Sequence, residues 1–302
     1  MSHHRTWETD YTSTFHHSSY ATVSPSRPEL SAAGKTIFIS GGARGLGTGI
    51  VDGFAQAGAA RLVVMGRTAT TLQAIATRIE AAHPSTSVAV VAGNVSREAD
   101  VARAFADAKK LAPGGIDVLV ANAGYFPTNT AVPPAPDGSE ESVDVADWWR
   151  AWEVNVKGVY LLARHFLAAD AAAPGAAFVN ISAGACHINP PFLGFSAYAG
   201  SKIGMARVVE TIQAENPGLR FFNVQPGVVK TDMLIKSGAE SYNMPLDEPE
   251  LPGHFLVWLT SPEGEFLKGK FVWVNWDVDE LKAKKEEILA GYKLVTGLVG
   301  WA

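Results

Sequence analysis

Short apolar runs alternate with stretches of helical periodicity along most of this chain, and this pattern constrains the fold more than any other feature. The runs are four or five residues long and end at glycine or polar residues, as fully buried strands do. They are Thr36–Ser40, Arg61–Met65, Val88–Ala92, Val118–Ala121, Ala177–Ile181, Arg220–Val224 and Lys270–Val274. Between them we expect helices, among them residues 70–82, 97–111, 148–169 and 198–214. The alternation predicts an α/β, doubly wound, Rossmann-like three-layer sandwich with a seven-stranded, mostly parallel sheet.

Composition excludes several classes of protein. The 302 residues are 47% hydrophobic and 18% charged, which is typical of a globular chain and not of a disordered one. The formal net charge of −5 argues against a generally basic nucleic-acid binder, and no apolar run reaches the length of a membrane span. The single cysteine, Cys186, excludes an internal disulfide framework and a zinc site made of thiolates. We therefore expect a soluble, cytoplasmic protein with no metal, nucleic-acid or membrane partner.

The N-terminal residues differ in texture from the rest. Residues 1–33 are rich in Ser, Thr, His and Pro and show neither helical nor strand periodicity, which predicts a flexible N-terminal extension. Their first twenty residues lack the apolar segment of a secretory signal. The remaining residues, 34–302, are predicted to form a single domain, with a surface loop in the Pro- and acid-rich stretch 126–147.

A glycine-rich loop follows the first predicted strand and opens a helix. In SGGARGLG, residues 40–47, the glycines Gly41, Gly45 and Gly47 enclose Arg44 and Leu46. Glycines at a strand-to-helix turn let a pyrophosphate approach bare backbone while the helix N-terminus faces its negative charge. The loop therefore predicts a dinucleotide site, and a merely flexible turn remains the alternative.

Two further patterns lie at predicted strand and helix ends. Asn122 and Gly124 follow the fourth strand, where an Asn-x-Gly turn either braces the central strands or approaches a ligand. Tyr198 and Lys202 are four residues apart on a helix, so phenol and ammonium share a face. A nearby ammonium favours the phenolate, which makes the tyrosine proton available to a carbonyl oxygen. Each pattern is common by itself.

In combination these motifs resemble the short-chain dehydrogenase/reductase family, in its compact single-domain branch. The resemblance covers residues 34–275 and rests on the glycine loop, Asn122-Ala-Gly124, Asn155, Ser182, Tyr198-x-x-x-Lys202 and Pro226-Gly227-x-x-x-Thr231. The segments 255–262 and 269–277 are similar to members found in fungal specialised metabolism. A seven-stranded fold, a nicotinamide dinucleotide cofactor and a homodimer or homotetramer are what this resemblance implies.

The same resemblance implies a role for each matching residue. Tyr198 would be the catalytic acid and base, while Lys202 would contact the nicotinamide ribose and lower the phenol pKa. Asn155 would sit at a helix irregularity and hold a water on a proton relay to the lysine. Val229 and Thr231 match positions that meet the nicotinamide end of the cofactor.

Two departures from the family pattern bear on function. The family usually has an acidic residue after the third strand, and this chain has Asn94 there. The side-chain amide of Asn94 can still form hydrogen bonds with an adenine edge. The catalytic serine usually takes the second place of an Ile-Ser-Ser stretch, which reads Ala183 here. Three outcomes remain open: Ser182 rotates into the site, another hydroxyl such as that of Ser196 or one on the substrate replaces it, or the reductase chemistry is weak or abandoned.

Cofactor choice is predicted from the end of the second strand. No carboxylate stands there to accept bonds from a ribose 2′-hydroxyl, whereas Arg67 and Arg44 can both approach a 2′-phosphate. We therefore expect NADP(H), and hydride transfer between it and a small, aromatic or polyketide-like carbonyl/alcohol pair. The alternatives are non-redox chemistry on the same fold, kept open by Ala183, and a cofactor-binding regulator. Loops around residues 126–147, 187–195 and 232–252 are expected to determine the substrate.

Overall fold

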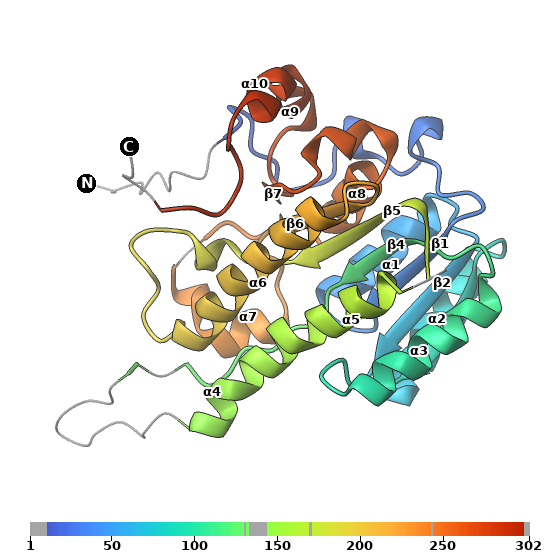
Figure 1. Ribbon diagram of the computed structural model, residues 1–302, viewed down its shortest axis with the longest axis horizontal. Coiled ribbons are helices and arrows are strands. Elements are labelled where there is room, and N and C mark those ends of the chain that lie inside the picture. Colours follow the sequence, from blue (N-terminus) through green and yellow to red (C-terminus); the bar gives the residue numbers. More distant parts are fainter. Residues whose placement is uncertain (1–10, 130, 133–143, 169–170, 243, 299–302) are drawn as a thin grey trace.

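One parallel sheet organises the molecule. The computed structural model describes residues 11–129, 131–132, 144–168, 171–242 and 244–298. Seven strands of these residues pair in parallel in the order β3-β2-β1-β4-β5-β6-β7 (Figure 1). Their bounds are β1 (Thr36–Ser40), β2 (Arg61–Gly66), β3 (Ser87–Ala92), β4 (Ile116–Ala121), β5 (Ala172–Ile181), β6 (Arg220–Gln225) and β7 (Phe271–Trp273). The predicted doubly wound, seven-stranded fold is confirmed.

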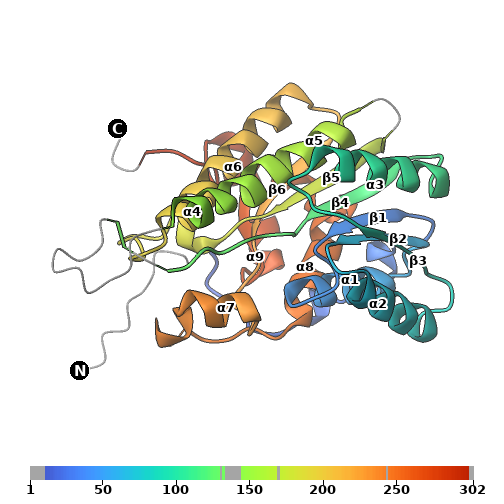
Figure 2. The same cartoon turned by 90° about the horizontal axis from the view of Figure 1, so that it is seen from below.

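Helices cover both faces of the sheet, as Figure 2 shows. One face carries α3 (Glu98–Leu111), α4 (Val145–Trp152), α5 (Val159–Phe166) and α6 (Ser196–Glu215). The other carries α1 (Leu46–Gln56), α2 (Ala69–Ala82) and α8 (Glu250–Leu259). Each interface between a helix layer and the sheet buries its own apolar core, the first around Phe105 and Phe166 and the second around Phe54 and Trp258. The buried apolar area of these two layers is what stabilises the sandwich.

The helix predicted over residues 148–169 is interrupted. It consists of α4, a π-helical turn over Glu153–Gly158 and then α5. π-turns inside helices occur mostly at functional sites. Trp152 packs over Gly200 and Gly204 of α6, whereas Trp149 is 56% exposed, so the tryptophans of this helix are only partly core residues.

Two short helices were not predicted, α7 (Asp232–Ser237) and α8. Six or ten residues give too few turns for a clear helical period, so the sequence does not distinguish them from loops. The charged stretch 277–287, whose pattern is typical of a solvent-exposed helix face, forms α9 (Val278–Ala283) and most of the first turn of α10 (Lys285–Ala290). Among the described residues, no helix is long and apolar enough to cross a membrane.

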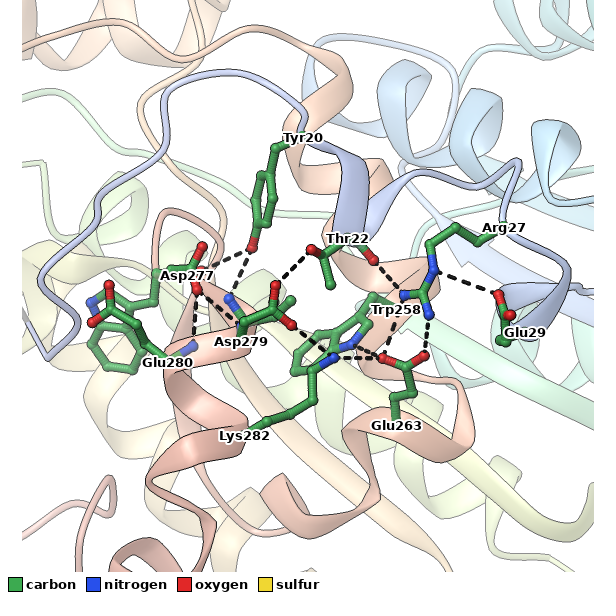
Figure 3. A network of polar contacts seen from close by, with 12 residues as sticks. Tyr20, Thr22, Arg27, Glu29, Trp258, Glu263, Asp277, Asp279, Glu280 and Lys282 are labelled. Atoms are coloured by element: carbon green, nitrogen blue, oxygen red, sulfur yellow. Dashed lines mark hydrogen bonds and ion pairs between the residues drawn. The ribbon is translucent and has the colours of Figure 1, made fainter.

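The prediction of a flexible extension is wrong for residues 11–33. Val23 and Leu30 are 0% and 2% exposed and belong to the core beside α1 and α8. Figure 3 shows how the polar side chains of this segment are used: Thr22 donates a hydrogen bond to Asp279, and Arg27 forms an ion pair of 2.6 Å with Glu263. The only helices of residues 11–33 are two 3-10 turns, Ala21–Val23 and Pro28–Leu30, which are too short to give the sequence a helical period. Residues 1–10 lie outside the described residues.

Candidate active site

A large cavity lies along the carboxyl ends of the strands. Its volume is about 790 Å³, within the range of small-molecule and cofactor sites. It spans the point where the strand order reverses, between β1 and β4, where ligands bind in open α/β sheets. Of the predicted site residues, Asn155 does not line the cavity. All the others do: Gly41, Arg44, Gly45, Leu46, Gly47, Arg67, Asn94, Asn122, Gly124, Ser182, Tyr198, Lys202, Val229 and Thr231.

The loop between β1 and α1 leaves no room for a side chain at two of its glycines. A Cβ at Gly41, where φ is +69°, would lie 2.9 Å from the Cα of Ala123. A Cβ at Gly47 would lie 2.1 Å from the carbonyl oxygen of Gly41. Bare backbone therefore faces the cavity at the N-terminus of α1, an arrangement that suits the pyrophosphate of a dinucleotide.

Asn122 braces the central strands, and it also lines the cavity. Its Nδ2 donates to the carbonyl oxygens of Ser40 and Gly41, at 3.1 and 3.0 Å. The backbone N–H groups of Asn122 and Ala123 both donate to the hydroxyl of Ser40, each at 3.1 Å. These bonds fix the ends of β1 and β4 relative to each other and so hold the glycine loop in place.

The residues that line the cavity after β2 and β3 include a cationic and an amide group. Arg67 follows β2 and Asn94 follows β3, and no carboxylate follows either strand among the lining residues; Arg44 of the glycine loop lines the same cavity. The Oδ1 of Asn94 accepts hydrogen bonds from the backbone N–H and the hydroxyl of Ser96, both at 3.0 Å. The side-chain Nδ2 of Asn94 can therefore donate a hydrogen bond to an adenine edge.

Tyr198 and Lys202 line the same cavity from the first turns of α6. The Tyr198 ring contacts that of Phe126, with the ring centroids 4.9 Å apart. The Nζ of Lys202 lies 5.7 Å from the centroid of the Tyr198 ring and donates a hydrogen bond of 2.6 Å to the carbonyl of Ile181. Tyr198 and Lys202 therefore lie on the same face of α6, as predicted, and the ammonium is held near the phenol ring by its hydrogen bond to β5.

The electrostatics of this pair correct one expectation. In the protein alone, burial raises the pKa of Tyr198 above its ordinary value, and the thiol of Cys186 raises it further. Burial also lowers the pKa of Lys202 from 10.5 to about 8. In the protein alone, the burial of the phenol outweighs the expected lowering of its pKa by Lys202, whose ammonium donates to the Ile181 carbonyl instead of to the phenol oxygen.

Asn155 occupies the predicted helix irregularity, the π-turn between α4 and α5. Its Oδ1 accepts from the backbone N–H of Tyr125 at 2.8 Å, and its Nδ2 donates to the Tyr125 carbonyl at 2.9 Å. The same Nδ2 donates to the hydroxyl of Ser201 on α6 at 3.0 Å. The side chain is fully buried and bonds the segment after β4 to α6, so its polar atoms are used by protein partners.

The structure narrows the question of the missing serine. Ala183 lines the cavity without a hydroxyl, beside Ser182, which is 1% exposed. The hydroxyl of Ser182 lies 3.5 Å from the carbonyl oxygen of Lys202 and 3.8 Å from the sulfur of Cys186. Ser196 accepts a hydrogen bond from the indole of Trp148 and does not line the cavity. Of the two serines considered, only Ser182 is among the residues that line the cavity.

Apolar side chains surround the cavity near Tyr198. They come from the three loops expected to determine the substrate and include Phe126, Phe192, Phe195, Met233, Leu234 and Met244. Trp273 of β7 adds a wall that the sequence did not indicate, since the strand pattern gives no sign of which side chain reaches the site. Its indole donates to His187 at 3.1 Å, and a Cβ at Gly184 would lie 2.8 Å from its ring.

Known proteins match the chain over most of its length. The family model described as short chain dehydrogenase matches residues 35–241. The chain is 32% identical over 290 residues to the short chain dehydrogenase andI of Emericella variicolor, covering 94% of this chain and 95% of that protein. It is 33% identical over 291 residues to the short chain dehydrogenase citE of Monascus ruber, covering 94% of each.

Solved structures agree in fold. A short-chain dehydrogenase/reductase from Serratia marcescens has a TM-score of 0.69 at 25% identity, covering 80% of this chain and 96% of that one. A short chain dehydrogenase from Burkholderia cenocepacia in complex with NADP has a TM-score of 0.68 at 23% identity, covering 82% and 99%. The sequence matches, together with the cavity and its residues, show that this chain is an oxidoreductase of the short-chain dehydrogenase/reductase family, similar to members from fungal secondary metabolism.

Proposed function

We propose that the protein interconverts a ketone and an alcohol with NADP(H) as its cofactor. The observation that carries the cofactor choice is the pair Arg44 and Arg67 among the residues that line the cavity, where no lining carboxylate follows β2 or β3. A guanidinium binds a 2′-phosphate as a planar, bidentate fork, whereas a carboxylate there would accept bonds from the 2′-hydroxyl of NAD(H). Neighbouring structures are described with NADP and with NADH, so this preference rests on the residues of the chain.

The residues present fit a dinucleotide along the whole cavity. The glycine loop would hold the pyrophosphate, Arg44 and Arg67 the 2′-phosphate, and Asn94 the adenine. Val229 and Thr231 line the end where the nicotinamide would lie. When bound, the reduced nicotinamide supplies a hydride to the carbonyl carbon of the substrate.

Proton transfer falls to Tyr198 and Lys202. In reduction, the Tyr198 hydroxyl would donate its proton to the substrate oxygen, and in oxidation the phenolate would accept it. Lys202 would stabilise the phenolate, and Asn155 keeps α6 and the segment after β4 together through its bonds to Ser201 and Tyr125. Ser182 is our candidate for the hydroxyl that steadies the substrate oxygen.

The substrate class follows from the walls around Tyr198. Phe126, Phe192, Phe195 and Trp273 present aromatic surface, which favours a small aromatic or polyketide-like ketone over a charged or sugar-like one. No observation on the described residues favours non-redox chemistry or a purely regulatory role.

Assembly and location remain expectations. We expect a homodimer or homotetramer, and the exposed Trp149 and Tyr160 on the outer side of α4 and α5 are consistent with a covered surface there. Sedimentation of the purified protein measures this directly. A cytoplasmic location is likewise expected.

Binding titrations test the cofactor choice. We expect NADPH to bind at least tenfold more tightly than NADH, and Arg67→Asp to remove that preference by placing a carboxylate near the 2′-position. The matched control is Arg97→Asp, which makes the same charge change at an exposed arginine outside the cavity lining. Equal affinities of the wild type for both dinucleotides would defeat the proposal. Loss of the reduced-nicotinamide absorbance with a panel of aromatic ketones then tests the reaction.

A further inference from the structure

A buried carboxylate outside the cavity lining holds one of the cavity's walls. Asp247 precedes α8, and its side chain is only 2% exposed. Its Oδ2 accepts a hydrogen bond of 2.5 Å from the backbone N–H of Val228, and its own N–H donates to the Val228 carbonyl at 2.9 Å. Both backbone polar groups of Val228 are thus bonded to one residue. A carboxyl group so buried needs hydrogen-bond partners for its oxygens.

The segment fixed by Asp247 is the loop between β6 and α7. Its residues 226–229 and Thr231 line the cavity at the end that also holds Tyr198. Gly227 has φ of +82°, and a Cβ there would lie 2.4 Å from the Oδ2 of Asp247. The loop therefore rests directly on the carboxylate, and the position of the carboxylate determines where Val229 and Thr231 meet a ligand.

The other carboxylate oxygen is bonded from two distant parts of the chain. The Oδ1 of Asp247 contacts the Nδ1 of His17 at 2.6 Å and accepts from the Nδ2 of Asn275 at 2.9 Å. His17 is placed by its backbone, because its carbonyl accepts from the N–H of Glu248 at 2.8 Å. The backbone of the neighbouring His16 is also bonded to Asn275. The His16 N–H donates to the Asn275 carbonyl at 2.7 Å, and the Asn275 Nδ2 donates to the His16 carbonyl at 2.8 Å.

We propose that Asp247 and His17 are positioning residues for the cofactor site, and that the N-terminal segment around His17 is part of its support. His17 and Asn275 hold the carboxylate, the carboxylate holds Val228, and the loop of Val228 forms the wall at the Tyr198 end of the cavity. Removing a residue that positions ligand-contacting groups without touching the ligand itself commonly lowers the affinity for that ligand. The inference rests on the proposed dinucleotide site but not on the choice between NADP(H) and NAD(H).

The loop lies at one end of the cavity, so displacing it should weaken the binding of ligands that reach this end and not of ligands that occupy only the other end. Binding of the whole dinucleotide depends on both ends, whereas 2′,5′-ADP occupies only the β2–β3 end with Arg44 and Arg67. We expect Asp247→Ala to raise the Kd of NADPH at least tenfold and to leave the Kd of 2′,5′-ADP within twofold. Asp247→Asn keeps one oxygen for the Val228 N–H and should bind NADPH with intermediate affinity, as a partial rescue.

His17→Ala tests the second residue without entering the core, since this imidazole is 43% exposed. We expect at least a threefold rise in the Kd of NADPH, again with 2′,5′-ADP binding unchanged. The matched control is His16→Ala, which removes the adjacent histidine and its bond to Asp277 but leaves Asp247 untouched. This control should bind NADPH within twofold of wild type.

Three results would overturn the proposal. They are unchanged NADPH affinity in both His17→Ala and Asp247→Asn, equal losses for NADPH and 2′,5′-ADP, or a loss in His16→Ala as large as that in His17→Ala. If the wild type prefers NADH, the proposed cofactor choice fails by itself. The same variants are then compared with NADH and 5′-AMP, so the two failures are distinguishable.

Discussion

Lys202 should be a source of instability in the folded protein at neutral pH. The residue is 3% exposed, and burial lowers the pKa of its ammonium from 10.5 to about 8. At 1.36 kcal/mol for each pKa unit, that difference corresponds to about 3 kcal/mol opposing the folded state. Lys202→Met removes this cost and the hydrogen bond to the Ile181 carbonyl, which is worth about 2 kcal/mol because its donor is charged. We expect the variant to be more stable than wild type by about 1 kcal/mol at pH 7.

The effect must have a specific pH dependence. The folded-state pKa of Lys202 is lower than the unfolded value, so the folded protein releases this proton first as the pH rises. The cost is fully present below about pH 8, declines between pH 8 and 10.5, and is absent above. The advantage of Lys202→Met should therefore shrink through this window and reverse within it, because wild type keeps its hydrogen bond to Ile181.

Urea denaturation followed by circular dichroism at pH 7, 8.5 and 10, without added dinucleotide, measures both effects. Groups common to the two proteins, including Tyr198, cancel in the difference. The control is Lys157→Met at an exposed lysine, for which we expect a difference below about 0.5 kcal/mol at each pH. A Lys202→Met protein that is less stable than wild type at pH 7, or a difference independent of pH, would refute the reasoning.

Three further predictions concern catalysis and the N-terminal segment. Tyr198→Phe should lower turnover by about 10²-fold or more while dinucleotide affinity stays within twofold, and turnover within threefold of wild type would remove Tyr198 from the mechanism. If Ser182 supplies the missing hydroxyl, Ser182→Ala should lose at least tenfold in ketone reduction and Ala183→Ser should gain little; the reverse pattern would revive the non-redox alternative. Burial raises the pKa of Glu263, but hydrogen bonds from Arg27 and other donors lower it to about 2. Glu263→Gln should therefore cost roughly 1 kcal/mol at pH 7 after screening by water, and the loss should fade as the pH drops from 4.5 towards 2 in acid denaturation curves.

The sequence could predict which residues line one cavity because the topology of the sheet brings them together. Parallel strands present their carboxyl ends at one edge of the sheet, so Gly41 after β1, Asn94 after β3 and Asn122 after β4 had to meet in one cavity. The spacing of four between Tyr198 and Lys202 fixes a shared helix face by local geometry alone. Such relations need only the secondary structure and the direction of the strands.

Electrostatic directions could not be obtained in the same way. The spacing of Tyr198 and Lys202 predicted a lowered phenol pKa, but the direction depends on how deeply both groups are buried. It also depends on the Ile181 carbonyl, which accepts the ammonium's hydrogen bond. Neither quantity is encoded in the spacing of the two residues. The bracing bonds of Asn122 likewise go to Ser40 and Gly41, which lie about eighty positions away in the sequence.

The two ends of the chain explain the largest error, and they also show why the N-terminal segment matters. The matched family model spans residues 35–241, whereas the segments on either side of it bond each other: Thr22 to Asp279, Arg27 to Glu263 and His17 to Asp247. Each pair joins positions more than two hundred residues apart, so no local period marks it in the sequence. The fungal relatives match about 94% of this chain, so the similarity extends beyond the span of the family model. Because Asp247 bonds Val228 in the loop that lines the cavity, residues 11–33 are linked to this wall through His17 and Asp247, and under our proposal a change in the docking of this segment alters ligand binding through Val228.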